Sequence, residues 1–351
     1  MHVIHARNVN DAYRKGLELV AMVGEHAASR NGEVIRLADP VTTVYSEPTE
    51  RVLFDVQRNA NPFFHLFEAL WMLNGQRDVA TLHPFLPGFQ QFSDDGEIFH
   101  GAYGYRWRHW PNYEENPPYI LEHDQLQTAI DLLRKNPDDR RVVIGIWDPA
   151  RDLASDSLDV PCNDLVKLRI VHGALDLHVY CRSNDAVWGC YGSNAVQFSI
   201  LQEYLAGRIG VPVGKYWQIS GDLHAYVDSP YQLQKFWPLI ERDTVNPYAP
   251  RLRGESLSEF PLVTKADTFD RELRHFMRIV SSHNEQLDFF DCENGFFDLV
   301  ALPMLRAHAQ YRNGTIDEAI AVLKDAQQAI SYPVDWLVAG ALWLGRRKKD
   351  V

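Results

Sequence analysis

Two alternating stretches in the middle of the chain constrain its fold more than any other feature. Residues 165–171 (LVKLRIV) alternate between apolar and polar side chains, and residues 175–180 (LDLHVY) do the same. Only the short link His172-Gly173-Ala174 separates them. Alternation with a period of two is typical of strands that bury one face, and so short a link joins antiparallel neighbours. The sequence therefore predicts a central β-hairpin.

A cysteine and an arginine flank this hairpin. Cys162 follows Pro161 and precedes the first strand, and Arg182 follows the second strand. In a hairpin the start of one strand lies beside the end of the next, so we expect the two residues to be neighbours. A nearby cation favours the thiolate, which is the nucleophilic form of cysteine. Cys162 is therefore either a candidate nucleophile or, as is common for a single cysteine, a buried structural residue.

A second candidate lies in an apolar helix that we predict over residues 61–75. Pro62 suits the first turn of this helix, and Asn74-Gly75 ends it. Glu68 falls within its apolar face. A carboxylate in that position is either half-exposed, or buried with a raised pKa and a chemical role.

Arginines at loop and strand ends are candidate anion ligands. Arg30 lies at the tip of a predicted turn, where an isolated arginine is usually just solvated. Arg140 and Arg141 precede a strand predicted over residues 142–147, and two guanidinium groups there form a plausible phosphate site. Neighbouring residues on a strand point to opposite faces, so both serve one phosphate only if the chain turns.

Two further segments supply polar aromatic candidates. Residues 85–110 are rich in aromatic side chains and in residues typical of loops, and they contain Tyr103. His224 and Tyr226 alternate after the strand predicted over residues 215–220, so both can face one ligand. Packing is the alternative for each of these residues.

Composition narrows the class of partner. The formal net charge of −12 argues against a general nucleic-acid-binding surface. The four cysteines have no spacing typical of a metal site and fit a reducing compartment. The first residues lack a signal-peptide pattern, and no apolar run reaches the length of a membrane span. We therefore expect a cytoplasmic protein that binds no metal, nucleic-acid polymer or membrane.

The last part of the chain differs in character. Beyond about residue 270 the sequence predicts successive helices over residues 270–290, 296–312, 315–331 and 333–347. Thr315 and Glu318 have the spacing of a capping box at the start of one of them. We divide the chain into a catalytic domain (residues 1–265) and a helical C-terminal extension (residues 266–351) that serves packing or assembly.

The order of these motifs resembles the thymidylate synthase superfamily. The resemblance covers roughly residues 15–230, and it rests on six segments in register: residues 68–75 (EALWMLNG), 103–104 (YG), 139–141 (DRR), 161–163 (PCN), 182–185 (RSND) and 221–226 (GDLHAY). It implies an α/β (α+β) fold in which helices surround a mixed sheet. It also implies a homodimer that packs sheet against sheet.

The resemblance implies a reaction as well. The substrate would be a pyrimidine nucleoside monophosphate, and 5,10-methylenetetrahydrofolate would donate one carbon to C5 of the base. Cys162 would attack C6 of the base, which turns C5 into a nucleophile that captures the methylene of the folate. Glu68 would move protons at the base through water, and Tyr103 would line the catalytic site.

Roles for the substrate-binding residues follow from the same resemblance. Arg30, Arg182 and Ser183 would hold the phosphate, and Arg140 and Arg141 would reach it from the second subunit. That origin removes the difficulty that two neighbouring strand residues point to opposite faces.

The sugar and the folate would be bound by the remaining residues. His224 and Tyr226 would bind the sugar hydroxyl, and Asp185 would hold the pterin. Ser183 leaves the choice between ribose and deoxyribose open, with deoxyribose favoured.

Departures from the family pattern favour a hydroxymethyl product over a methyl product. Asn163 stands where thymidylate synthases usually have histidine, and Phe89 stands where they have the tryptophan that packs on the folate. We find no closing C-terminal tail of the family type. After the folate leaves, its methylene group remains attached to C5 of the base. If hydride from the folate cannot reach this methylene, water can add to it instead. The segment RSNDAVWG (residues 182–189) also resembles the pyrimidine nucleotide hydroxymethylases.

The residue that reads the base is Ser193 or Asn194. The family places it eleven residues after the arginine, which gives Ser193 without a gap and Asn194 with a one-residue insertion. A side-chain amide offers both a donor and an acceptor, so Asn194 permits uracil and does not exclude cytosine. Because the nearest motif neighbours act on cytidylates, we lean slightly towards cytosine. The alternatives are a true thymidylate synthase acting on dUMP and a catalytically dead binding protein on the same scaffold.

Overall fold

The fold is built on a mixed six-stranded sheet. A computed structural model describes residues 1–113, 120–228, 246–249, 256–282 and 292–348. The strand order across the sheet is β1 (His2–Ala6), β4 (Val41–Tyr45), β11 (Val213–Ser220), β9 (Ala174–Cys181), β8 (Asn163–Val171) and β7 (Val143–Gly145). The pairs β1–β4 and β11–β9 are parallel, and the other pairs are antiparallel. This architecture agrees with the predicted α/β class.

The central hairpin is the pair β8–β9. Its strands are antiparallel, and the register places Asn163 opposite Cys181 at the open end. At the closed end, His172 and Gly173 both have positive φ angles, of 52° and 79°. The turn and the pairing are therefore those expected from the alternation, and the prediction of a hairpin is confirmed.

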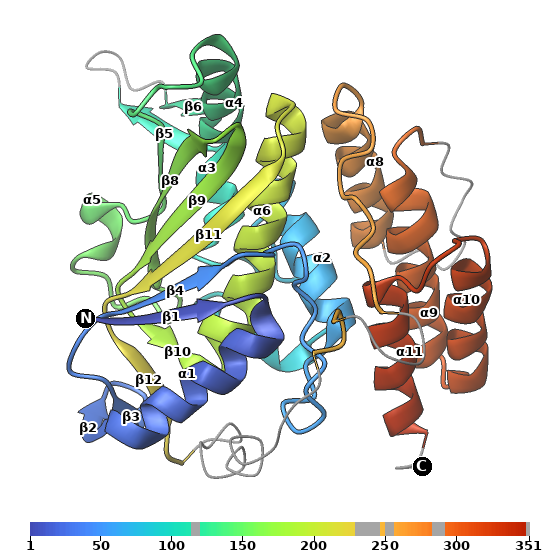
Figure 1. Ribbon diagram of the computed structural model, residues 1–351, viewed down its shortest axis with the longest axis horizontal. Helices are drawn as coiled ribbons and strands as arrows, with labels where there is room; N and C mark the ends of the chain where they lie inside the picture. Colours follow the sequence, from blue (N-terminus) through green and yellow to red (C-terminus); the bar gives the residue numbers. More distant parts are fainter. Residues whose placement is uncertain (114–119, 229–245, 250–255, 283–291, 349–351) are drawn as a thin grey trace.

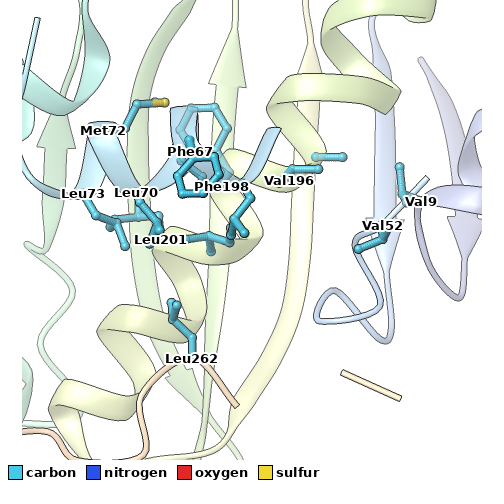
Figure 2. Close-up of a cluster of buried hydrophobic side chains, with 14 of the residues drawn as sticks. Val9, Val52, Phe67, Leu70, Met72, Leu73, Val196, Phe198, Leu201 and Leu262 are labelled. Atoms are coloured by element: carbon cyan, nitrogen blue, oxygen red, sulfur yellow. The ribbon is translucent and has the colours of Figure 1, made fainter. Parts of the chain in front are cut away.

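Helices α2 (Pro62–Leu73) and α6 (Asn194–Ile209) lie along one side of the six-stranded sheet (Figure 1). Strands β8 and β9 turn alternate apolar residues to the core, among them Val166 and Leu177. Figure 2 shows Phe67 of α2 beside Phe198 of α6 within this core. Burial of such side chains stabilises a fold by roughly 1.5–3 kcal/mol each. The core thus fixes α2 and α6 relative to the strands.

Helix α2 begins and ends as its sequence predicts. The side chain of Asn61 accepts hydrogen bonds from the backbone N–H groups of Phe63 and Phe64, and Pro62 occupies the first turn. At the other end Gly75 has a φ of 75°. All twelve residues of α2 are buried. The helix therefore carries Glu68 into the interior of the molecule.

A second sheet completes the central part of the fold. Its order is β10 (Asn184–Asp185), β12 (Leu223–Tyr226), β3 (Gly32–Arg36) and β2 (Glu25–Ser29), and α1 (Val9–Val23) packs against it. Asp185 pairs with His224, and Arg30 lies in the turn between β2 and β3. Three segments that are far apart in the sequence are thereby brought side by side.

Several smaller elements differ from expectation. Tyr103 begins a short helix, α3 (Tyr103–Arg108), within the region predicted to be rich in loops, which also contains η1 (Pro87–Phe92). The strand predicted over residues 142–147 is shortened to β7. The remaining elements are α4 (Gln125–Lys135), α5 (Pro149–Asp152) and the pair β5 (Trp110–Tyr113) and β6 (Ile120–His123).

The C-terminal helices form a group beyond α2, drawn in orange to red in Figure 1. They are α8 (Phe269–Ser282), η4 (Phe297–Ala301), α9 (Leu302–Arg312), α10 (Ile316–Gln328) and α11 (Asp335–Arg347). Phe63 of α2 and Trp343 of α11 pack edge to face with ring centroids 5.5 Å apart. The same buried core runs through both parts of the chain, and the division at residue 265 stays a prediction.

The helix predicted over residues 270–290 is confirmed for its first part, which is α8. Residues 283–290 lie outside the described part of the chain.

The capping box at the start of α10 was wrong, because Thr315 makes no side-chain cap hydrogen bond. Its hydroxyl donates instead to the backbone oxygen of Gln310, 2.9 Å away in the preceding helix. The Thr315 hydroxyl is therefore engaged with α9 and does not cap α10.

Candidate active site

A cavity of about 240 Å³ opens between α2, α3, the start of β8 and the segment that joins β9 to α6. Among its lining residues are eight of the candidates from the sequence: Glu68, Phe89, Tyr103, Cys162, Ser183, Asp185, Ser193 and Asn194. They come from five separate segments of the chain. The fold therefore gathers most of the residues expected to act on substrate or folate at one site.

Cys162 lies at the mouth of the central hairpin, as predicted. The backbone N–H of Arg182 donates to the carbonyl oxygen of Cys162 over 2.9 Å. The backbone N–H of Cys162 points to the hydroxyl of Tyr103, 3.4 Å away. Cys162 is thereby held between the strand end and helix α3, with its side chain on the cavity wall.

The pKa of the Cys162 thiol is set by burial and by the charges around it. Burial raises it above the ordinary value, and the charges of Arg182 and Arg30 lower it by less than burial raises it. Asp159 nearby raises it further. Arg182 therefore lowers the pKa of the thiol, as the hairpin predicted, but burial raises it by more than the two arginines lower it.

The Arg182 side chain is directed along the chain that precedes the cysteine. Its Nε donates to the carbonyl oxygen of Pro161 over 2.9 Å, and its guanidinium lies over the ring of Trp147 at 5.2 Å. Such a contact between a cation and an aromatic face contributes about 0.5–1 kcal/mol at an exposed site. Arg182 thus lies beside the nucleophile but not among the cavity-lining residues.

The sequence left open whether Glu68 is half-exposed or buried, and in the structure it is buried. Its side chain is 6% exposed, and burial raises its pKa to about 8, while a hydrogen bond from Gln197 opposes the rise. Its Oε2 atom has no hydrogen-bond partner among the residues that the structure describes. At neutral pH this carboxyl group therefore carries a proton and has a free oxygen at the cavity.

A second carboxyl group, Asp159, also lines the cavity and was not predicted. Its Oδ2 accepts a hydrogen bond from the backbone N–H of Gly101 over 2.8 Å. Burial raises its pKa to about 7. The signal in the sequence was its position three residues before Cys162, on the segment that carries the nucleophile into the cavity.

Two cavity walls are made by other candidates. Phe89 packs edge to face on Phe64 of α2, with ring centroids 5.2 Å apart. The carboxylate of Asp185 accepts hydrogen bonds from the backbone N–H groups of Val187 and Trp188, which begin the π-helical segment η2 (Ala186–Ser193). Trp188 itself lines the cavity and was missed as a site residue.

The two candidates for reading the base both lie at the cavity. Ser193 Oγ has no hydrogen-bond partner within the described ranges. Asn194 begins α6, and its side chain is hydrogen-bonded to two other amides, Asn163 and Asn184. Both residues therefore remain candidates for reading the base, as the sequence left them.

His224, Tyr226 and Arg30 lie next to the cavity rather than in its lining. The rings of His224 and Tyr226 meet edge to face at 5.5 Å, so the two side chains face the same side, as the alternation predicted. His224 Nδ1 is 3.1 Å from a carboxylate oxygen of Asp222. The charge of Arg30 lowers the pKa values of both Tyr226 and Cys162, which indicates that its guanidinium lies near both.

Arg140 and Arg141 are exposed before β7 and do not line the cavity within one chain. The side chain of Arg141 is 81% exposed and contacts Asp139 at 2.6 Å. This pairing lowers the pKa of Asp139 to about 2.

Two kinds of feature are missing from the described part of the chain. No group of three or more His, Cys, Asp or Glu side chains there is arranged to hold a metal ion. None of the helices described has both the length and the apolar character to cross a membrane.

Comparisons with known proteins place the chain among relatives of one kind. The family model for thymidylate synthase matches residues 12–277. A deoxyuridylate hydroxymethyltransferase of Pseudomonas phage M6 is 39% identical over 99% of this chain and 95% of its own length. Proteins of the same name from Bacillus phage SP01 and Delftia phage PhiW-14 are 38% and 32% identical over 65% and 68% of this chain, and over 60% and 68% of their own lengths.

Proposed function

This chain belongs to the thymidylate synthase family, and from that premise we propose that it hydroxymethylates C5 of deoxyuridylate with 5,10-methylenetetrahydrofolate as the one-carbon donor. It is an enzyme that transfers a one-carbon unit to C5 of a pyrimidine nucleotide. The observation that carries the choice of substrate and product is the phage M6 relative, whose similarity extends over nearly the whole of both chains. The proposal replaces the slight preference for cytosine, which rested on a short motif.

The first half of the reaction is assigned to Cys162 and Glu68. The Cys162 sulfur forms a bond to C6 of the base, and the electron pair released at C5 attacks the methylene carbon of the folate. C5 then loses its proton, tetrahydrofolate leaves, and an exocyclic methylene remains on the base. Glu68 is protonated at neutral pH because burial raises its pKa to about 8, so it can donate a hydrogen bond to the base.

Water completes the reaction in place of hydride. Its oxygen bonds to the exocyclic carbon, the electron pair of the double bond moves towards the carbonyl at C4, and one proton of the water leaves. We assign this proton to Asp159, whose pKa of about 7 suits a base at neutral pH. Collapse of the enolate restores the C5–C6 double bond and expels the Cys162 thiolate.

The cavity supports hydration of this intermediate. Phe89 lies in its wall where the thymidylate synthases have a tryptophan. Among the residues that the structure describes, none after Gln197 lines the cavity. Helix α11 instead packs on α2, and Arg346 near its end hydrogen-bonds Asn59. In the proposed reaction, water rather than hydride reaches the exocyclic carbon.

The binding roles are assigned from position. Arg30, Arg182 and Ser183 hold the phosphate, since the first two carry positive charge to the mouth of the site. His224 and Tyr226, whose rings share one face, bind the sugar.

Two cavity walls are assigned to the folate. Phe89 and Asp185, which both line the cavity, contact the pterin. Both are held in place from behind, Phe89 by the ring of Phe64 and Asp185 by two backbone N–H groups.

A homodimer brings Arg140 and Arg141 to the partner's phosphate. The face of the six-stranded sheet opposite α6 supports this assembly, because it presents Val3, Val143 and Tyr180, which are 38–49% exposed. On the same face the rings of His178 and Trp217 stack at 5.7 Å. We propose this face as the surface on which the two sheets meet.

We assign the enzyme to the cytoplasm. All four cysteines are free thiols, which fits a reducing compartment.

Tritium release from C5 tests the proposal. The enzyme is incubated with methylenetetrahydrofolate and either dUMP or dCMP tritiated at C5, while absorbance reports any dihydrofolate. We expect release from dUMP without dihydrofolate, and no release with Cys162→Ala. Formation of dihydrofolate in step with release would indicate a thymidylate synthase. Absence of release from both nucleotides would indicate a binding protein.

A further inference from the structure

Arg58 is a buried cation in contact with a segment that lines the cavity. It lies shortly before α2, is 4% exposed and is not among the described residues that line the cavity. Its Nε donates to the backbone oxygen of Val187 over 2.7 Å, and its guanidinium lies over the ring of Trp188, 4.9 Å from the centroid. Both contacts are to η2, so a residue outside the cavity lining holds part of the cavity wall.

The chain leaves room for this guanidinium at Gly192, further along η2. A Cβ atom on Gly192 would come 3.3 Å from Arg58 Nη2 and 3.5 Å from the backbone oxygen of Val187. The first of these distances is tighter than an ordinary contact. The lack of a side chain at Gly192 therefore lets the guanidinium lie close against η2.

Two side chains at the start of η2 suit a flat heterocycle that carries N–H groups. Trp188 and Asp185 both line the cavity, and the carboxylate of Asp185 accepts the first backbone N–H groups of η2. The remaining lone pairs of a carboxylate can accept hydrogen bonds from ring N–H and amino groups. An indole ring can stack on a flat ring system. The pterin of the folate has a flat ring system, a ring N–H and an amino group.

The charge of Arg58 also acts on Asp185. Burial raises the pKa of Asp185, two backbone hydrogen bonds oppose the rise, and so do the charges of His224 and Arg58. An ionised carboxylate only accepts hydrogen bonds, so it is the form that matches the donors of a pterin. Arg58 thus favours this form of Asp185 in addition to its contacts with Val187 and Trp188.

Resting on the proposed function, we propose that Arg58 is a positioning residue for the folate, because it holds Trp188 and Asp185 in the arrangement that receives the pterin. The residues assigned to the sugar, His224 and Tyr226, belong to β12 rather than to η2. Loss of the Arg58 guanidinium therefore weakens binding of the folate more than binding of the nucleotide.

The test removes this guanidinium and compares the two substrates. In Arg58→Met, KM for methylenetetrahydrofolate should rise about tenfold or more, the value of one hydrogen bond from a charged group, while KM for dUMP stays within about twofold. Equilibrium binding of tetrahydrofolate in the presence of dUMP should weaken by a similar factor.

Arg51→Met is the matched control. Arg51 is also a buried arginine, 3% exposed, and its guanidinium contacts Glu203. It is not among the described residues that line the cavity. The control should therefore keep the ratio of the two KM values that the parent enzyme has.

The outcomes separate this proposal from the proposed function. If Arg58→Met leaves KM for the folate unchanged, or raises both KM values equally, the proposal is wrong while the function stands. An equal rise of KM for the folate in Arg51→Met would also overturn it, because a general disturbance of the fold would then explain the change.

A second pair of variants keeps the test decisive if Arg58→Met does not fold. Arg58→Lys keeps the charge but loses the planar guanidinium and its Nε–H group, so the same selective rise is expected, with Arg51→Lys as its control. A parent enzyme that releases no tritium from either dUMP or dCMP would refute the proposed function itself.

Discussion

At the scale of single residues, the site depends on charge states that burial controls. Cys162, Glu68 and Asp159 each have a raised pKa, and burial is the largest cause in all three. Two of them are carboxyl groups on one cavity wall with pKa values of about 8 and about 7. Near neutral pH one carboxyl is therefore mostly protonated and the other is partly ionised, which suits one to donate and the other to accept a proton.

Replacement of Asp159 should separate the two halves of the reaction. We expect Asp159→Asn to lower formation of the hydroxymethyl product by about 10²–10⁴-fold, the usual contribution of a general base. Tritium release in a single turnover should stay within a few-fold of the parent rate, because C5 is activated before water adds. Asp164→Asn is the control, since Asp164 is also partly buried with a raised pKa but does not line the cavity. An equal loss of both signals in Asp159→Asn would contradict the assigned role.

Glu68 should make the folded chain less stable as the pH rises. Its carboxyl group loses its proton near pH 4.5 in the unfolded chain and near pH 8 in the folded chain. Between these values the folded chain binds more protons, so the free energy of unfolding falls by up to about 1.4 kcal/mol per pH unit for this group. Urea unfolding at about pH 5.5 and about pH 7.5 should show a smaller fall in Glu68→Gln. Equal falls in both proteins would show that Glu68 ionises normally.

Residue types were predictable from the sequence, but their charge states were not. Cys162 and Arg182 are neighbours as the hairpin required, yet the pKa of the thiol is raised rather than lowered. A spacing in the sequence gives the nearest cation and does not give the depth of burial. Asp159 was missed for a related reason, because its hydrogen bond to Gly101 joins segments 58 residues apart.

At the scale of elements, helix α3 reaches the cavity only because its contact with α2 is unusually close. A Cβ atom on Gly104 would lie 2.0 Å from the backbone oxygen of Met72 and 2.3 Å from its Cα atom. No rotamer change can relieve a contact with backbone. Gly104 therefore lets α3 place the Tyr103 hydroxyl beside Cys162.

Gly104→Ala should separate these two helices. We expect the free energy of unfolding to fall by roughly 1–3 kcal/mol, the usual cost of overpacking, together with a loss of activity as Tyr103 shifts. Gly88→Ala is a suitable control, because no heavy atom lies within 4 Å of the added Cβ atom there. Urea unfolding of the two variants checks the prediction, and equal stability would contradict it.

Periodic elements were the most predictable part of the fold. The hairpin β8–β9 and helix α2 begin and end close to where alternation, Asn61 and Gly75 indicated. Helix α3 was missed because it is only six residues long, too short to show a period. The capping box at Thr315 failed because a tertiary partner, Gln310, competed for the hydroxyl.

At the scale of the whole molecule, the proposed dimer completes the site. Arg141 is exposed in one chain and is not among the residues that line the cavity of that chain. The sequence left open how the adjacent residues Arg140 and Arg141 could both bind one phosphate. Within one chain, neither of them lines the cavity. In the proposed dimer, the second subunit would bring these arginines to the phosphate.

Mixing two inactive variants should restore activity. Cys162→Ala lacks the nucleophile, and Arg141→Ala lacks the cation that the partner would provide. After the two are unfolded and refolded together in equal amounts, about a quarter of the parent activity should return, because half of the dimers are mixed and each holds one intact site. Refolding each variant alone is the control. No recovery from the mixture would show that Arg141 serves its own chain.

The product formed in water labelled with oxygen-18 tests the central claim most directly. Purified enzyme, dUMP and 5,10-methylenetetrahydrofolate are incubated in this water, and the nucleotide and folate products are analysed by mass spectrometry. Hydroxymethyl transfer predicts that the nucleotide gains CH₂O with the heavy oxygen and that tetrahydrofolate is released. A nucleotide that gains only CH₂, with no label and with dihydrofolate as the second product, would contradict the claim.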